Sequence, residues 1–108
     1  MLRLNNLPKQ LSRKINKEKL VDICRNNDII FMALFGSFAV GTQRTGSDID
    51  IIIKFDKSKE KSLLDLVHAE NEFQKLFKRK VDLLTPGSLS PYLRNDILDS
   101  MRVIYEKK

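Results

Sequence analysis

Asp48 and Asp50 flank Ile49 at the start of an isoleucine-rich segment, residues 48–55. If this segment is a strand, alternate residues point to the same side, so the two carboxylates share a face with their Cα atoms about 7 Å apart. Two acids this close repel each other, and a divalent cation would relieve the repulsion. Hard oxygen ligands without a neighbouring imidazole or thiolate favour Mg²⁺ or Mn²⁺. The alternative is a solvated strand start that carries aspartates and no ligand.

A third acid, Asp82, lies in the middle of the short apolar segment 81–84. Burying a carboxylate without a partner is costly. Asp82 therefore either pairs with a lysine such as Lys80 or completes an acidic triad with Asp48 and Asp50. Three carboxylates can hold two metal ions, one on the triphosphate of a nucleotide and one on an attacking hydroxyl. Asp82 would then be a metal ligand or the general base.

Gly36 and Ser37 directly follow the apolar run 29–35. A glycine at the end of a buried strand lets the backbone turn sharply and lets a ligand approach closely. If Ser37 begins a helical turn, its hydroxyl and the free N–H groups form a cradle for phosphate. A plain turn between a strand and a helix is the alternative that the dipeptide alone leaves open.

The chain offers a simple set of elements to position these residues. Strands are predicted over 29–35, 48–55 and 81–84, with a short edge strand over 102–106. Apolar residues at helical spacing predict a helical N-terminal segment over 8–26, a long helix over 58–77 and a last helix from 90 or 91 to about 101. Residues 37–42 are expected to add one or two helical turns. This order predicts an α+β fold, a two-layer sandwich in which helices pack on a small mixed sheet of three or four strands.

Length and composition limit the classes of protein. The chain has 108 residues and a mass of 12.5 kDa, with 42% hydrophobic and 31% charged residues. It is expected to form a single domain over 1–108 with its catalytic core at about 29–105. We expect a cytoplasmic protein without a membrane partner, because no membrane span or signal peptide is recognisable. One Cys and one His exclude an internal disulfide and argue against zinc.

The net charge of +6 raises the question of nucleic-acid binding. The basic residues are mixed with acids along the chain, and only Lys78–Lys80 form a tight cluster. With no Trp and only two Tyr, bases would have few side chains to stack on. Nucleic acid is therefore disfavoured as a partner.

The segment 36–41 (Gly-Ser-Phe-Ala-Val-Gly), six further residues and then Asp48-Ile49-Asp50 resemble the signature of DNA polymerase β-like nucleotidyltransferases. That signature is Gly-Ser-x-Ala-x-Gly, a short loop, Ser-Asp-x-Asp and an apolar strand, and Ser47 supplies its second serine. The resemblance covers about residues 29–105. In length, the chain is similar to the minimal nucleotidyltransferases (MNT) that act as antitoxins beside HEPN-domain toxins.

The resemblance implies a Mg²⁺-dependent nucleotidyltransferase, with two ions expected and Mn²⁺ able to substitute. ATP is the implied substrate, and the implied acceptor is a tyrosine hydroxyl of a cognate HEPN-type toxin, which AMP transfer silences. The implied nucleotide-binding residues are Gly36, Ser37 and Ser47. The implied catalytic and metal-binding residues are Asp48, Asp50 and Asp82.

One departure keeps a second function open. Many members of the family have Arg where this chain has Val40, so a contact of that arginine to phosphate or to a partner is lost here. The alternative function is a binding module with weak or absent catalysis that neutralises its partner by complex formation. A small-molecule nucleotidyltransferase is disfavoured, because that class normally carries an extra helical domain for the acceptor. Homo-oligomerisation is left open.

Overall fold

A four-stranded mixed sheet forms the centre of the computed structural model, which describes residues 11, 15–36 and 48–107. The strands are β1 (Ile29–Phe35), β2 (Ile49–Phe55), β3 (Val81–Leu84) and β4 (Arg102–Glu106). Their order across the sheet is β3-β2-β1-β4. β1 is antiparallel to both of its neighbours, whereas β2 and β3 are parallel. The predicted α+β fold with a mixed sheet is confirmed, including the short edge strand near the end of the chain.

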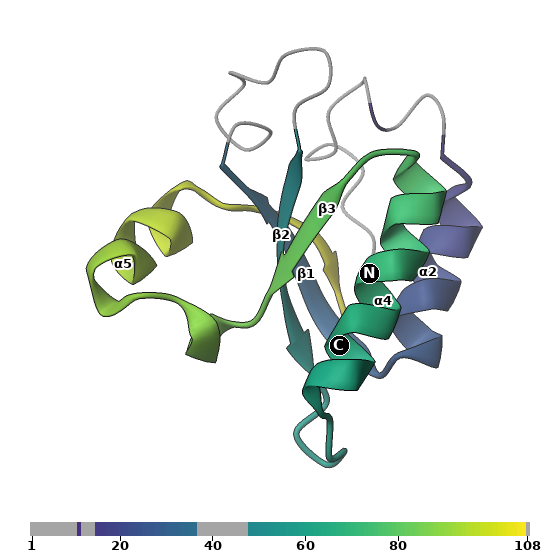
Figure 1. The fold of residues 1–108 in the computed structure, drawn as a ribbon, viewed down its shortest axis with the longest axis horizontal. Helices are drawn as coiled ribbons and strands as arrows, with labels where there is room; N and C mark the ends of the chain where they lie inside the picture. Colours follow the sequence, from purple (N-terminus) through teal and green to yellow (C-terminus); the bar gives the residue numbers. More distant parts are fainter. Residues whose placement is uncertain (1–10, 12–14, 37–47, 108) are drawn as a thin grey trace.

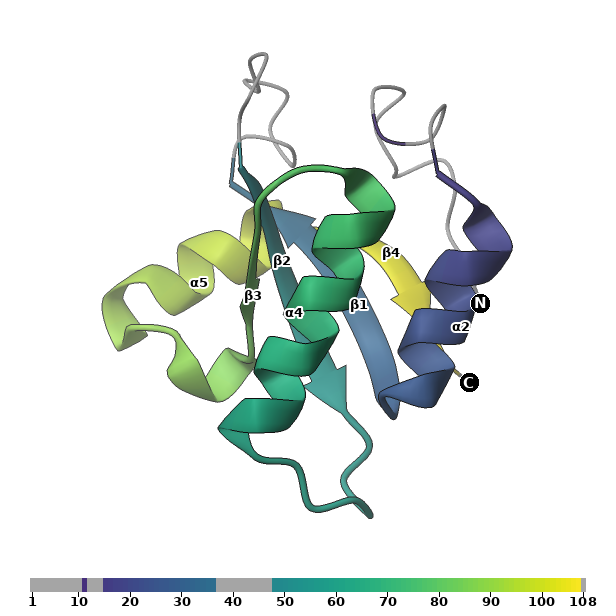
Figure 2. The same ribbon diagram turned by 45° about the vertical axis from the view of Figure 1, so that its right-hand side comes forward.

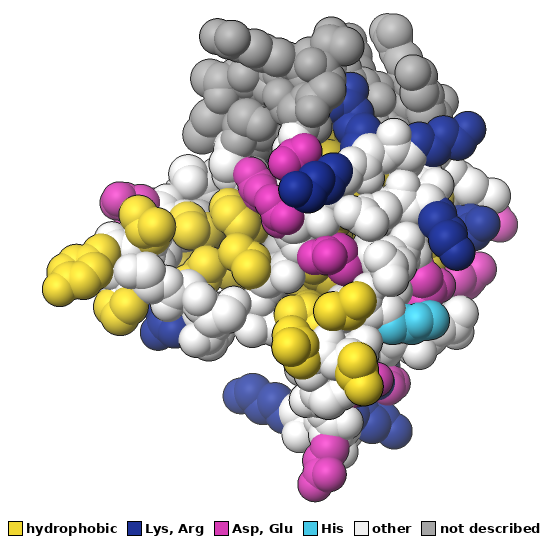
Figure 3. Space-filling view, in the orientation of Figure 1, with side chains coloured by type: hydrophobic (Ala, Val, Ile, Leu, Met, Phe, Trp, Pro, Cys, Tyr) yellow, Lys and Arg dark blue, Asp and Glu magenta, His cyan; other side chains and the backbone are white. Residues whose placement is uncertain are grey.

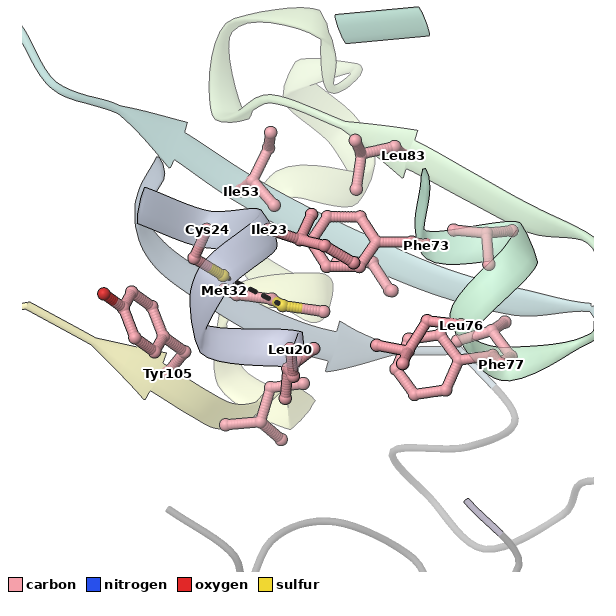
Figure 4. Close-up of a cluster of buried hydrophobic side chains, with 14 of the residues drawn as sticks. Leu20, Ile23, Cys24, Met32, Ile53, Phe73, Leu76, Phe77, Leu83 and Tyr105 are labelled. Carbon is pink, nitrogen blue, oxygen red and sulfur yellow. Dashed lines mark hydrogen bonds between the residues drawn. The ribbon is translucent and has the colours of Figure 1, made fainter. Parts of the chain in front are cut away.

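Two helices lie side by side on one face of the sheet, α2 (Lys17–Asn26) and α4 (Leu63–Phe77) (Figures 1 and 2). Side chains of both helices meet the strands in the main core (Figure 4). This core includes Phe73 of α4 and Cys24 of α2, whose Sγ lies 4.0 Å from Sδ of Met32 in β1. Burial raises the pKa of the Cys24 thiol to about 12, so the thiol is a packing group and not a reactive one.

The opposite face of the sheet is covered more thinly. Its buried cluster consists of Phe31, Ala33, Ile52 and Leu89. Beyond the 3₁₀ turn η2 (Pro86–Ser88), α5 (Pro91–Ser100) contributes Ile97, which is only partly buried against this cluster. No residue of α5 is fully buried. The sheet therefore has one face sealed by two helices and one face that remains partly open.

The start of the long helix differs from the sequence prediction. The long helix begins at Leu63 and not at Ser58, because Ser62 caps it: the backbone N–H of Ser62 donates to Oδ2 of Asp65 at 2.8 Å. The preceding residues form a turn in which Asp56 Oδ1 accepts from the backbone N–H of Ser58 at 2.9 Å. Within the predicted helical segment 8–26, Leu11 is helical and α2 begins at Lys17, where Oδ1 of Asn16 accepts from the backbone N–H of Lys19. The predicted helical start near residue 8 and the turns over 37–42 lie outside the described residues.

None of the helices in the described part of the chain is long and apolar enough to cross a membrane.

Candidate nucleotide and metal site

The parallel pairing of β2 and β3 brings two of the predicted site residues together. In this register Asp50 lies directly opposite Asp82, and Ile49 lies opposite Val81. The pairing begins with the backbone N–H of Ile49, which donates to the carbonyl of Lys80 at 2.9 Å. Residues paired across neighbouring strands point to the same face of a sheet, and so do residues two apart along one strand. Asp48, Asp50 and Asp82 thus share one face.

The acidic face is the one opposite α2 and α4. Ile52 follows Asp50 by two positions, and Leu84 follows Asp82 by two positions. Both residues belong to the smaller cluster on the α5 side of the sheet. Figure 3 shows acidic side chains gathered above an apolar patch on one face of the molecule. The carboxylates therefore open onto the thinly covered face, where a ligand has room to approach.

Asp50 is the electrostatic centre of this group. Partial burial raises its pKa, and the negative charges of Asp82 and then Asp48 raise it further. A hydrogen bond between the Asp50 and Asp82 carboxyl groups acts in the same direction. Each of these causes disfavours the charged form of Asp50, and a bound cation would offset them.

Lys80 pairs with Asp48 and not with Asp82, the partner that the sequence left open. Its Nζ lies 4.0 Å from Oδ2 of Asp48, and the two side chains are 68% and 45% exposed. Solvent screens an ion pair at this distance and exposure, so its contribution is small. This ion pair therefore does little to offset the charges of Asp50 and Asp82.

Gly36 closes the site on the β1 side. Its neighbour Phe35 lies opposite Asp50 across the antiparallel β1–β2 pair. The backbone of Gly36 has φ +69°, and a Cβ atom there would overlap Oδ2 of Asp50. Only glycine satisfies both requirements without strain. The structure thus brings together Gly36, Asp48, Asp50 and Asp82, whereas Ser37, Ser47 and Val40 lie outside the described residues.

The donor set fits a hard divalent cation. Its oxygen atoms all come from carboxylates, which are ligands that Mg²⁺ and Mn²⁺ prefer. The pKa of Asp50 is raised first by burial and then by the charges of Asp82 and Asp48, and a cation would offset that repulsion. Within residues 11, 15–36 and 48–107, no three acidic, His or Cys side chains already form a group that could hold a metal ion. A cation would therefore have to draw these carboxylates together, with further ligands from its substrate or water.

Sequence reasoning missed two residues that position Asp82. β3 is an edge strand, and its outward backbone N–H groups donate to side chains of α4. The N–H of Val81 donates to Oε1 of Gln74 at 3.1 Å, and the N–H of Leu83 donates to Oε2 of Glu70 at 3.0 Å. These bonds bracket Asp82. The spacing of four residues, which places Glu70 and Gln74 on one side of a helix, was the available signal.

The sequence of this chain was compared with family profiles and with known proteins. A sequence profile described as "Polymerase beta, Nucleotidyltransferase" matches residues 18–108. A Methanocaldococcus jannaschii protein named "Putative protein adenylyltransferase" is 37% identical over 83 residues, which are 77% of this chain and 87% of that protein.

Two solved structures share the fold. A structure described as a "putative minimal nucleotidyltransferase" has a TM-score of 0.66 and 27% identity, covering 83% of this chain and 87% of the other. A second structure is described as the tri-AMPylated HEPN toxin of Shewanella oneidensis in complex with MNT antitoxin. The match to it has a TM-score of 0.60 and 18% identity, with 83% of this chain and 69% of the other covered. At that identity the second match shows the fold alone.

Proposed function

This chain belongs to the polymerase β-type nucleotidyltransferase family, and we propose that it transfers AMP from ATP to a tyrosine hydroxyl of a HEPN-type toxin, acting as that toxin's antitoxin. The observation that carries the proposal is the in-register pair of Asp50 and Asp82, with Asp48 on the same face and Gly36 against Asp50. The name of the Methanocaldococcus relative supports protein as the acceptor class. The description of the Shewanella complex supports a HEPN partner and AMP as the transferred group.

In the proposed reaction the tyrosine oxygen forms a bond to the α-phosphorus of ATP. The bond from that phosphorus to the oxygen bridging the β-phosphate breaks, and pyrophosphate leaves. The hydroxyl proton passes to the carboxylate of Asp82. Mg²⁺ held by Asp48, Asp50 and Asp82 would supply positive charge for the triphosphate and for the attacking oxygen.

The remaining predicted residues are assigned to nucleotide binding. Gly36 keeps its place beside Asp50 free of a side chain, so backbone and carboxylate can face a phosphate group at close range. We assign Ser37 and Ser47 hydrogen bonds to the same triphosphate. Burial and then the charges of Asp82 and Asp48 raise the pKa of Asp50, so a cation that favours its charged form should bind better as the pH rises.

The test of catalysis is Asp82→Asn. The purified protein is incubated with ATP, Mg²⁺ and the product of its neighbouring gene, the proposed HEPN-type partner, and the partner is weighed by intact mass spectrometry. We expect the wild type to add one or more adenylyl units and Asp82→Asn to add none. Asp22→Asn, which removes an exposed acid of α2, is the matched control and should behave like the wild type.

The outcome also decides between enzyme and binding module. If the wild type adds no mass with ATP, GTP, CTP or UTP but still binds and silences the partner, the binding module is correct. Calorimetry with Mg-ATP separates the metal site from catalysis. Asp48→Asn should weaken Mg-ATP binding, and equal binding by both proteins would remove Asp48 from the site.

A further inference from the structure

Two groups of large apolar side chains are exposed on helices of the described chain. One lies at the start of α4 and consists of Leu63, Leu64 and Val67. The other, which we call the α5 patch, consists of Tyr92, Leu93 and Leu98. Tyr92 is 91% exposed and Leu64 80%. Exposed clusters of this kind commonly mark interaction surfaces. The two groups lie on opposite sides of the sheet, and the carboxylates Asp48, Asp50 and Asp82 share a side with one of them.

Only the α5 patch shares a face with the carboxylates. α5 packs through Ile97 on the cluster that contains Ile52, whereas α4 packs on the other side of the sheet. α5 also leads toward the site. Shortly after the helix ends, Arg102 pairs with Leu34 of β1. The next residue of β1, Phe35, pairs with Asp50. In Figure 3 apolar side chains extend over α5 toward the acidic group.

We propose that the α5 patch docks the protein that receives the nucleotide, through an apolar surface of that protein bordered by basic residues. The inference rests on the proposed function. A protein acceptor must contact this chain beside Asp82, and the α5 patch is the exposed apolar group on that face. Tyrosine is enriched at the centres of protein interfaces, and the two leucines add apolar area beside it.

Charge favours a basic acceptor over a second copy of this chain. α5 carries the exposed acids Asp96 and Asp99 against one exposed base, Arg94, which donates to the carbonyl of Pro86, so the helix is net acidic although the whole chain has a net charge of +6. In a symmetric dimer through this helix, the same acids of both copies would meet. An acceptor with Lys or Arg around its apolar surface would complement them.

Nothing in the fold requires the exposed side chains of this patch. No residue of α5 is fully buried, and the helix is capped by Oγ of Ser90, which accepts from the backbone N–H of Tyr92. Replacing the Tyr92 and Leu93 side chains leaves that cap intact. The double variant Tyr92→Ser/Leu93→Ser should therefore fold, which its melting curve checks.

The experiment compares this variant with Leu63→Ser/Leu64→Ser, a matched change at the other exposed group. The probe is the product of the neighbouring gene, the HEPN-type partner of the proposed function. The affinity of each variant for the partner is measured by calorimetry without nucleotide, and modification of the partner is measured by intact mass. Binding of Mg-ATP to each variant is measured in a separate titration. We expect the α5 variant to lose about tenfold or more in affinity and in transfer rate at low acceptor concentration. Mg-ATP binding should stay unchanged, and the α4 variant should match the wild type.

The outcomes separate this inference from the proposed function. Transfer by the wild type with an unchanged α5 variant would overturn the docking site alone. Binding without transfer, weakened by the α5 variant, would overturn the enzyme and support the docking site. A wild-type dimer that the α5 variant dissolves would assign the patch to a second copy and overturn the inference. No binding and no transfer by the wild type would overturn both.

Discussion

At Gly36 the absence of a side chain decides where Asp50 can lie. The backbone there is left-handed, with φ +69°, and a Cβ atom would overlap the carboxylate. A strand end elsewhere tolerates alanine, so the requirement comes from the neighbouring acid and not from the turn alone. The glycine and the acid thus form one structural unit, although they are 14 residues apart in the sequence.

Gly36→Ala should destabilise the protein by about 1–2 kcal/mol from the left-handed backbone alone. It should also displace Asp50 and weaken Mg-ATP binding. Chemical denaturation and calorimetry measure the two effects. Gly87→Ala is the control, because a Cβ at Gly87 meets nothing within 4 Å. Equal stability of both variants would show that Gly36 carries no such constraint.

Asp50→Asn should stabilise the metal-free protein at neutral pH. The pKa of Asp50 is raised in the fold by burial and by Asp82 and Asp48, so folding favours the protonated form. The stability gained from the protonated form is present at low pH and is lost as the pH rises through the raised pKa. The variant's gain in melting temperature, measured in EDTA, should therefore be largest at neutral pH. It should vanish below the pKa of an unfolded aspartate.

The sequence predicts the acids of the site better than their contacts. Spacing and residue type suffice to place Asp48 and Asp50 on one face, because a strand alternates its side chains. The hydrogen bond between Asp50 and Asp82 depends on the β2–β3 register, which joins residues 32 apart. The pairing of Lys80 with Asp48 depends on the same register, so local patterns could not distinguish it from a pair with Asp82.

Among the elements, β3 depends most on its neighbour α4. It has four residues and forms one edge of the sheet, so its outer N–H groups need partners that another strand cannot give. Glu70 and Gln74 accept these groups, and the helix thereby holds the strand that carries Asp82. The orientation of a candidate general base thus rests on two side chains that do not belong to the site.

Glu70→Ala should remove the bond to Leu83 and cost about 1–2 kcal/mol. Hydrogen exchange of the Leu83 amide should become faster, because the group is left to solvent at a sheet edge. Glu70→Gln keeps an acceptor oxygen and should restore slow exchange. If both variants exchange as slowly as the wild type, the bond does not fix the strand.

The start of α4 shows where periodicity misleads at the level of elements. Leu63 and Leu64 fit the apolar spacing of a helix, yet both are exposed. The helix begins where Ser62 and Asp65 form a capping box, five residues later than the predicted start at Ser58. The turn before it is fixed by Asp56, whose carboxylate binds the backbone N–H of Ser58.

The whole molecule is asymmetric across its sheet. One face is sealed by α2 and α4, and the other carries the acids, the smaller apolar cluster and the exposed side chains of α5. The order of elements predicts that helices pack on a sheet. It does not predict that β4 pairs with β1, or which face is left open, because these depend on contacts between distant segments.

Because Cys24 is buried, its reactivity with a thiol reagent measures how often the surrounding core opens. Cys24 is the single cysteine of the chain, it packs between α2 and the sheet, and its pKa is about 12. A thiol reagent should therefore label the protein once per molecule, at the rate at which this core opens. Because the core joins both helices to the sheet, opening is expected to be global, and Mg-ATP bound on the other face should slow labelling. At 100 times its dissociation constant, the ligand should slow labelling about a hundredfold. Slowed labelling would report ligand binding without any acceptor or any turnover, whereas unchanged labelling would mean that α2 detaches alone.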